Sequence, residues 1–239
     1  MAKEVVVKAK KVYGRKKKFS NIKIILSILL LVLVLIFIIL GVIYKGGKFT
    51  ITLDKRLSRE SGIVIYEDLL VKESKMKLSA RDLEFMDNIS IDWIPKNIDN
   101  ESDGSHNGEN YIAYTFYIEN KGKDIINYWY SIVIDDVIKN VDEAARVMVY
   151  LNGDKKVYAK KNAYTNEPEK DTIPFYSKKQ AVLEERKDFK PNDVDKYTIV
   201  IWLEGDDPDC IDNILGGEIK MHMEIREEHK EESINNEKE

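Results

Sequence analysis

The residues best suited to chemistry in this chain are four aspartates near its C-terminal end. Asp206, Asp207, Asp209 and Asp212 lie in one short segment around Pro208, whose ring restricts the backbone. Carboxylate oxygens are the ligands that Ca²⁺ prefers, and several of them on one loop can surround a single ion. A calcium site is one interpretation of this segment, and Ca²⁺ is the one cofactor that the sequence suggests. We favour the other interpretation, an acidic loop between strands that binds no metal and a protein without a cofactor.

A second acidic segment begins like a calcium loop and then departs from the pattern. Asp99, Glu101 and Asp103 alternate along the chain and are followed by Gly104, as at the start of an EF-hand loop. Asn110 occupies the twelfth position, where that loop needs a bidentate Glu. We therefore interpret residues 97–110 as a solvated loop.

Histidine and cysteine form no catalytic pattern. His106, His222 and His229 are far apart, and the His-Glu-x-x-His motif of zinc proteases is absent from the sequence. The single cysteine, Cys210, lies among the aspartates, where negative charge raises the pKa of a thiol and weakens it as a nucleophile. We predict no catalytic residue, and hence a protein that is not an enzyme.

Aromatic residues are concentrated between residues 111 and 130. Exposed rings can stack on sugars, so a carbohydrate-binding surface is one interpretation. The alternation of the segment places about half of its rings on one face of a strand, and tyrosine is common on sheets. We favour the interpretation that these rings pack in a core.

An apolar segment, residues 24–44, determines where all these residues lie in the cell. It has no charged side chain and would form a helix of about 31 Å, enough to cross a bilayer core of about 30 Å. The basic residues before it favour a cytoplasmic N-terminus. A cleaved signal peptide is the alternative, although the segment is longer than a signal core and no Ala-x-Ala-like site follows it. We predict a single-pass anchor in the cell membrane with an extracellular C-terminal domain.

Charge is divided unequally on the two sides of this segment. The first 23 residues carry nine basic groups and one acidic group, whereas the chain as a whole has a net charge of −4. The remainder therefore carries −12, which argues against nucleic acid as a partner. We expect the membrane and other surface or matrix proteins, including further copies of this chain, as partners. The predicted parts are a basic cytoplasmic tail (1–23), a transmembrane helix (24–44), an ectodomain (48–226) and a disordered charged tail (227–239).

The ectodomain has the sequence pattern of strands and turns. Asn152 and Gly153 separate two strand-like segments, 146–151 and 154–160, and are a strong hairpin signal because both tolerate positive φ. Residues 197–203 are almost wholly apolar, which is typical of a strand buried on both faces. Residues 218–225 alternate strictly between apolar and polar. Further strands are expected at 49–53, 63–66, 89–94, 111–118 and 125–134.

Little helix is expected outside the apolar segment. Ser79 and Asp82 have the spacing of a capping box and predict a short helix that ends near Met86. Residues 141–145 fit one helical turn, and residues 177–183 are ambiguous. The pattern as a whole predicts an all-β, antiparallel sandwich of jelly-roll or immunoglobulin-like type. We expect its shared core to include Trp93, Trp129 and Trp202.

Residues 197–225, YTIVIWLEGDDPDCIDNILGGEIKMHMEI, resemble the closing segment of a family of secreted and surface β-sandwich proteins of low-GC Gram-positive bacteria. That family includes TasA-like biofilm matrix proteins and camelysin-like proteins. Residues 141–160 and 61–67 also resemble it. The resemblance implies a jelly-roll or immunoglobulin-like sandwich and, from the camelysin-like members, a metallopeptidase activity.

Three functions are consistent with these observations. The first is a membrane-anchored β-sandwich that acts through protein contacts in cell-surface adhesion, envelope or biofilm-matrix assembly. The second is a camelysin-like surface metallopeptidase. The third is a sensor ectodomain that recruits a partner, because the short cytoplasmic tail holds no enzymatic domain. We favour the first, with residues 49–53 as a strand that neighbouring copies exchange.

Overall fold

The computed structural model describes residues 9–44, 48–83 and 85–227. The chain divides into two compact units, Met1–Gly47 and Lys48–Glu239. Residues 228–239 of the predicted disordered tail lie outside the described residues.

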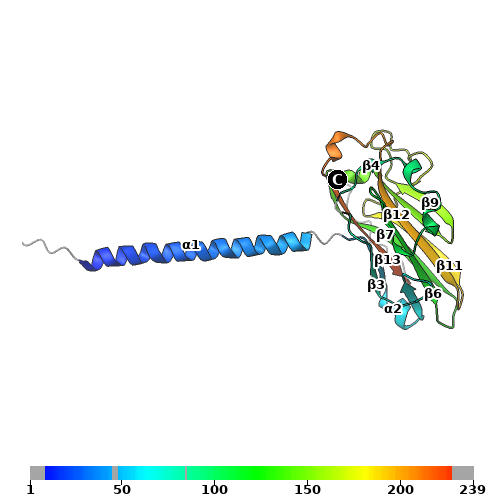
Figure 1. The fold of residues 1–239 in the computed structure, drawn as a ribbon, viewed down its shortest axis with the longest axis horizontal. Coiled ribbons are helices and arrows are strands. Elements are labelled where there is room, and N and C mark those ends of the chain that lie inside the picture. The colour runs from blue at the N-terminus through cyan, green and yellow to red at the C-terminus, as the bar shows by residue number, and fades with distance from the viewer. Residues whose placement is uncertain (1–8, 45–47, 84, 228–239) are drawn as a thin grey trace, which may run out of the picture. The chain divides into compact units, whose positions relative to one another are not determined.

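The first unit contains one helix, α1 (Ala9–Tyr44), coloured blue in Figure 1. Within α1, Asn21–Ile39 is the one segment of the described residues that is long and apolar enough to cross a membrane. Its side chains are exposed to the surroundings rather than packed against protein. An apolar N-terminal helix is therefore confirmed, and it has the form that both a membrane span and a signal sequence share.

The second unit is mostly β-structure and contains two sheets (Figure 1). The first sheet has five strands, in the order β11 (Gln180–Phe189), β7 (Ile126–Ile138), β13 (Glu218–Arg226), β1 (Thr50–Leu53) and β3 (Lys77–Ser79). The main path of the second has six, in the order β10 (Ile173–Pro174), β9 (Asp154–Ala159), β8 (Ala145–Leu151), β12 (Val194–Glu204), β6 (Ile112–Asn120) and β2 (Ile63–Tyr66). Two short strands, β4 (Asn88–Ile89) and β5 (Gly104–Ser105), pair with β12 and β6.

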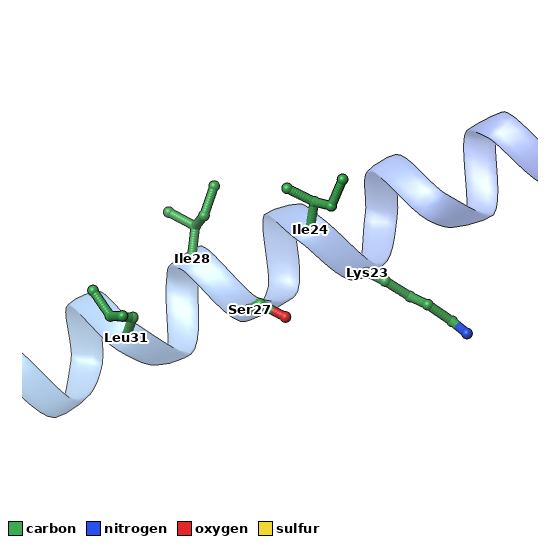
Figure 2. A pocket seen from close by; sticks show the side chains of 5 residues that line it. All are labelled: Lys23, Ile24, Ser27, Ile28 and Leu31. Carbon is green, nitrogen blue, oxygen red and sulfur yellow. The ribbon is translucent and has the colours of Figure 1, made fainter.

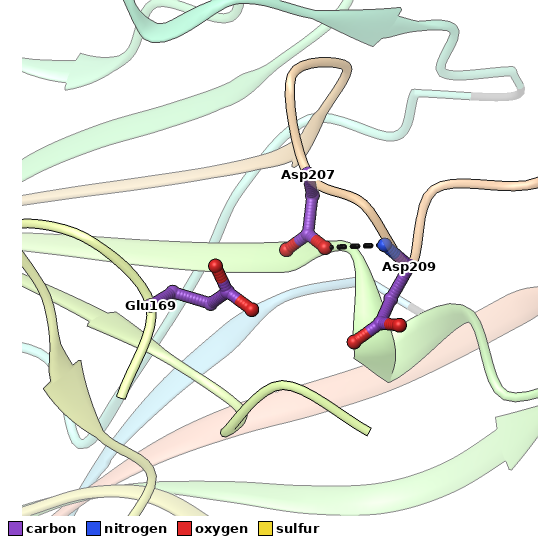
Figure 3. Close-up of side chains that lie close together, drawn as sticks. All are labelled: Glu169, Asp207 and Asp209. Carbon is purple, nitrogen blue, oxygen red and sulfur yellow. Dashed lines mark hydrogen bonds between the residues drawn. The ribbon is translucent and has the colours of Figure 1, made fainter. Parts of the chain in front are cut away.

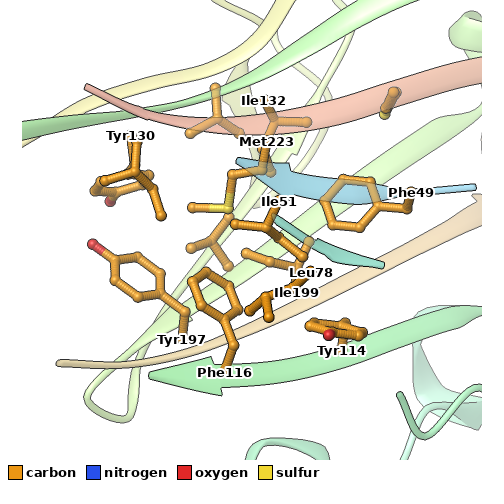
Figure 4. Packing of buried hydrophobic residues seen from close by; sticks show 14 of the residues in the cluster. Phe49, Ile51, Leu78, Tyr114, Phe116, Tyr130, Ile132, Tyr197, Ile199 and Met223 are labelled. Carbon is orange, nitrogen blue, oxygen red and sulfur yellow. The ribbon is translucent and has the colours of Figure 1, made fainter. Parts of the chain in front are cut away.

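The two sheets face each other across a shared hydrophobic core, part of which is drawn in Figure 4. The first sheet contributes buried side chains such as Ile51, Ile132 and Met223, and the second contributes Phe116 and Ile199. Most of the aromatic residues between 111 and 130 are buried, as expected for core packing. The alternation of β13 also has its predicted sense, because its apolar side chains point into this core.

The prediction that all strands pair antiparallel is wrong, because both sheets are mixed. β1 pairs parallel with β13, β4 with β12, and β10 with β9. A tight turn imposes antiparallel pairing only on strands that it connects, as Asn152 and Gly153 do for β8 and β9. β1 and β13 lie far apart in the chain, so no turn determines their relative direction.

A second, smaller core covers the outer face of the second sheet. The segment that contains the short helices η1 (Ile91–Trp93) and η2 (Ile98–Asn100) supplies Ile94 and Ile98, which belong to the same buried cluster as Val200 and Trp202 of β12. This packing explains why β12 is apolar on both faces. It also corrects the interpretation of residues 97–110 as a solvated loop, because Ile98 is fully buried.

The prediction of three tryptophans in the shared core is wrong. Trp202 is buried, but it belongs to the smaller core. Trp93 is 74% exposed, and Trp129 is half-buried. Trp93 points away because the chain turns into a 3₁₀ helix there, and its neighbour Ile94 is the residue that packs inward.

Several local predictions also change. No helix forms at 79–86 among the described residues, because Ser79 pairs with Thr50 in the ladder between β3 and β1. The strand expected at 89–94 is reduced to β4, and the ambiguous residues 177–183 lead into β11. The helical turn predicted at 141–145 is present as η3 (Val141–Glu143). The remaining helices are α2 (Lys55–Arg59) and η4 (Asp212–Ile214).

A buried polar cluster links the two sheets near the start of β12. Asp195 is 1% exposed and accepts hydrogen bonds from Tyr128 Oη (2.7 Å), Asn152 Nδ2 (2.7 Å) and Arg186 Nε (3.0 Å). Tyr128 Oη also lies 2.9 Å from Tyr197 Oη. Tyr128 and Arg186 belong to the first sheet, so the Asp195 cluster joins the sheets by hydrogen bonds within an otherwise apolar region.

Candidate functional site

The opposite end of β12 brings together acidic side chains from two connecting segments. The first is the loop after β12, residues 205–211, and the second is the loop between β9 and β10, residues 160–172. They meet because β8 pairs with both β9 and β12, so that Ala159 and Trp202 both lie beside Arg146.

Arg146 is the cation at this end of the sheet. Its side chain is 5% exposed, and its guanidinium Nη2 forms an ion pair with the fully buried carboxylate of Asp207. Its Nη1 donates to the carbonyl of Ala145 at 3.3 Å. A buried guanidinium needs an anionic partner, and Asp207 supplies it.

Asp209 joins the same region from two residues further along. Its backbone N–H donates to Asp207 Oδ1 at 2.7 Å, and its own Oδ2 accepts from the backbone N–H of Ala163 at 2.8 Å. Asp209 therefore holds the loop of residues 205–211 against the loop of residues 160–172. Both aspartates are 6% exposed.

Glu169 completes a cluster of three carboxylates, which we call the carboxylate cluster. One ligand atom each from Glu169, Asp207 and Asp209 lies within 4.8 Å of the other two. Figure 3 shows the three side chains converging from the two loops. Glu169 Oε1 is buried and has no hydrogen-bond partner.

The structure therefore divides the four aspartates that the sequence singled out. Asp207 and Asp209 meet in the carboxylate cluster, but Asp206 and Asp212 are exposed and lie outside it. The third member, Glu169, is far away in the sequence and carries no local motif. Only the pairing of β8 with both β9 and β12 could have indicated it, since that pairing brings the ends of the two loops together.

A lysine and two more acidic residues lie close by in the fold. Lys160 Nζ donates to Asp142 Oδ2 and Glu143 Oε1, each at 2.7 Å. Burial opposes the positive charge of Lys160, but these two hydrogen bonds outweigh burial and raise its pKa. Glu143 Oε2 is buried without a hydrogen-bond partner. Negative charge thus exceeds positive charge among the side chains at this end of the sheet.

The other residues considered for chemistry have structural surroundings. Burial, followed by the charges of Asp207 and Glu204, raises the pKa of the Cys210 thiol and disfavours the reactive thiolate, against a hydrogen bond from Asn88. The ring of His106 lies within hydrogen-bonding distance of two backbone carbonyls. His222 lies between Asp135 and Glu224, on the outer face of the first sheet. His229 lies outside the described residues.

One surface hollow lies on the helix of the first unit (Figure 2). Its walls are successive side chains of a single helix, Lys23, Ile24, Ser27, Ile28 and Leu31. A hollow lined by one helix alone has the form of a groove along its surface rather than of a ligand pocket.

Comparisons with known proteins give no assignment. No protein family matches the chain, and no curated protein does. Among solved structures, a β-glucosidase from Kluyveromyces marxianus in complex with glucose matches with 10% sequence identity and a TM-score of 0.27. The match covers 75% of this chain and 18% of that chain. A likeness this distant carries no argument about fold or function.

Proposed function

We propose that this protein is a membrane-anchored, extracellular β-domain that acts through protein contacts in cell-surface adhesion, envelope or matrix assembly. Helix α1 would be the anchor, with the N-terminus in the cytoplasm. We also propose that the two facing sheets belong to the jelly-roll or immunoglobulin-like class. The observation that best supports assembly is the position of β1.

β1 is the first strand after the apolar helix, and it is short. It lies between β13 and β3 and contributes two buried side chains to the shared core, Ile51 and Leu53, and Phe49 just before it contributes a third. β1 is the first strand of the second unit, and β13 stays paired with β7 when β1 leaves its place. β3 pairs with β1 and would lose that partner until another copy supplied the strand. The open position between β13 and β3 would then accept the same strand from another copy, which is a form of β-strand addition. We propose that copies assemble by this exchange of β1.

Disulfide trapping tests the exchange directly. Thr50 of β1 faces Ser79 of β3 in the ladder. One chain would carry Thr50→Cys and the other Ser79→Cys, both in a Cys210→Ser background and with different tags. Because neither chain holds both cysteines, β1 of one copy must pair with β3 of the other to bring the two thiols within the distance that a disulfide needs, unless the chains oxidise at random. We expect a covalent heterodimer under oxidising conditions.

A matched pair from the β8–β9 hairpin provides the control. Leu151→Cys and Asp154→Cys are partners across the hairpin turn and should remain within one chain. A heterodimer from the β1–β3 pair alone would support exchange. Equal yields from both pairs would show random oxidation. No heterodimer, together with a monomer by light scattering at all concentrations, would contradict self-assembly.

A further inference from the structure

The carboxylate cluster holds more negative charge than its protein partners neutralise. Asp207 and Asp209 are each 6% exposed, and Glu169 places a third carboxylate against them. Arg146 is the cation paired with this cluster, and its ion pair is with Asp207. Like charges this close repel each other, and burial makes the repulsion stronger because water no longer screens it.

The hydrogen bonding of Glu169, which is half-buried, adds a second observation. The buried oxygens of Asp207 and Asp209 receive donors from Arg146, from the Asp209 N–H and from the Ala163 N–H. In contrast, Glu169 Oε1 is buried and receives none. A buried carboxylate oxygen without a donor is unfavourable unless a cation lies against it. Figure 3 shows that this carboxylate is directed toward the two aspartates.

The chemistry of the donors selects the class of cation. All three ligands are carboxylates, which suit a hard cation rather than Zn²⁺. The nearby soft ligand, the Cys210 thiol, accepts a hydrogen bond from Asn88. Oxygens bound to one Ca²⁺ at about 2.3–2.6 Å lie at most about 5 Å apart. The separations within 4.8 Å in the cluster meet this limit.

We propose that Glu169, Asp207 and Asp209 bind one Ca²⁺ ion, with Arg146 holding Asp207 in position. The ion ties the loop of residues 160–172 to the loop of residues 205–211, and so fastens the connection after β9 to the connection after β12. This inference is independent of the proposed assembly through β1, which lies in the other sheet.

Thermal unfolding of the full chain in detergent micelles tests the site. Chelator-treated protein would be measured in EDTA, in Ca²⁺ and in Mg²⁺, with titration to about 10 mM to cover the weak affinities of extracellular calcium modules. We expect Ca²⁺ to raise the Tm by several degrees, because an ion that binds only the folded state stabilises it. Mg²⁺ should act less strongly, since it demands a tighter octahedral site.

Glu169→Gln separates loss of Ca²⁺ binding from a general loss of stability, because we expect it to raise the Tm in EDTA but to reduce the Tm shift that Ca²⁺ produces. In EDTA its Tm should be higher than that of the wild type, since the negative charge of a half-buried carboxylate, one of whose oxygens is buried without a donor, is removed from beside two other carboxylates. In Ca²⁺ its Tm shift should be less than half of the wild-type shift, since a charged ligand is lost. The matched control is Glu167→Gln, an exposed residue of the same loop, which should keep the full shift.

Calorimetric titration of wild-type protein with CaCl₂ provides a measurement that needs no variant. One Ca²⁺ per chain is the expected stoichiometry. The proposal is overturned if the wild type binds no Ca²⁺, if its Tm does not respond to the ion, or if Glu169→Gln keeps the wild-type shift.

Discussion

The two ends of β12 each bury an aspartate beside an arginine, but the surroundings of the two aspartates are opposite. Asp195 is surrounded by donors, because a phenol, an amide and the Arg186 guanidinium all direct hydrogens at its oxygens. Asp207 receives Arg146 and one backbone N–H, and two further carboxylates lie against it.

The contrast shows how one type of buried charge can serve two purposes. At the Asp195 end each polar group satisfies another, so the cluster is complete and joins the two sheets. At the Asp207 end the protein leaves a carboxylate oxygen without a donor. The Asp195 cluster, whose polar groups are paired with one another, stabilises the fold. The carboxylate cluster keeps an oxygen without a donor, which is the kind of atom that binds a cation.

Removing the Asp195 carboxylate should lower the unfolding free energy more than any other change considered at the two ends of β12. Asp195→Ala leaves Tyr128, Asn152 and Arg186 without their shared acceptor inside the domain, and loss of one partner from a buried charged pair costs about 3–5 kcal/mol. Urea unfolding measures the change in unfolding free energy. The control is Glu185→Ala, whose partly exposed pair with Lys187 should contribute less than about 1 kcal/mol. A cost for Asp195→Ala as small as the control's would contradict a structural role for the cluster.

The equivalent change at the other end should cost less. In chelator, Asp207→Ala leaves Arg146 close to two other carboxylates that can replace the lost partner, so we expect a loss of about 1–3 kcal/mol in unfolding free energy. The same denaturant titration applies to both variants. If Asp207→Ala lowers the unfolding free energy more than Asp195→Ala does, the neighbouring carboxylates do not replace Asp207 as the partner of Arg146, and the expected order of the two ends is wrong.

The smallest expected difference between the two ends of β12 lies in how the unfolding free energy changes at alkaline pH. Burial first, and then the neighbouring charges, raise the pKa of Tyr128 and Tyr197 well above the usual value. Below about pH 10 such a tyrosine is protonated in both the folded and the unfolded protein, and its contribution to the unfolding free energy is fully present. Above that pH only the unfolded state loses the proton, so the folded state becomes less stable as the pH rises. Tyr128→Phe should make the decline above pH 10 shallower by up to about 1.4 kcal/mol per pH unit. Asp207→Ala should keep the wild-type slope, and equal slopes for wild type and Tyr128→Phe would contradict the assignment.

Local sequence patterns predicted the elements of the second sheet well. The hairpin at Asn152 and Gly153 has positive φ at both residues, as its sequence requires. The apolar run of β12 is buried on both faces because a core lies on each side. The turn depends on neighbouring residues alone, and the continuous apolar run of β12 is itself visible in the sequence, so both could be predicted from local patterns.

Three of the failures involve distant partners. Ser79 and Asp82 have the spacing of a helix cap, but Ser79 pairs with β1 and Asp82 forms an ion pair with Lys48 at 3.2 Å. The parallel pairing of β1 with β13 likewise joins distant parts of the chain. Glu169 belongs to the carboxylate cluster only because two loops meet at the end of the sheet. Tertiary contacts decided these three cases, and a local sequence pattern contains no information about such contacts.

A crystal structure grown with Ca²⁺ tests the difference between the two ends most directly. We expect one ion bonded to oxygens of Glu169, Asp207 and Asp209 at about 2.3–2.6 Å, and no ion within bonding distance of Asp195. An anomalous difference map identifies the ion independently of the refined coordinates. A map without a peak between these three carboxylates, or with a peak at Asp195 instead, would contradict the proposed calcium site.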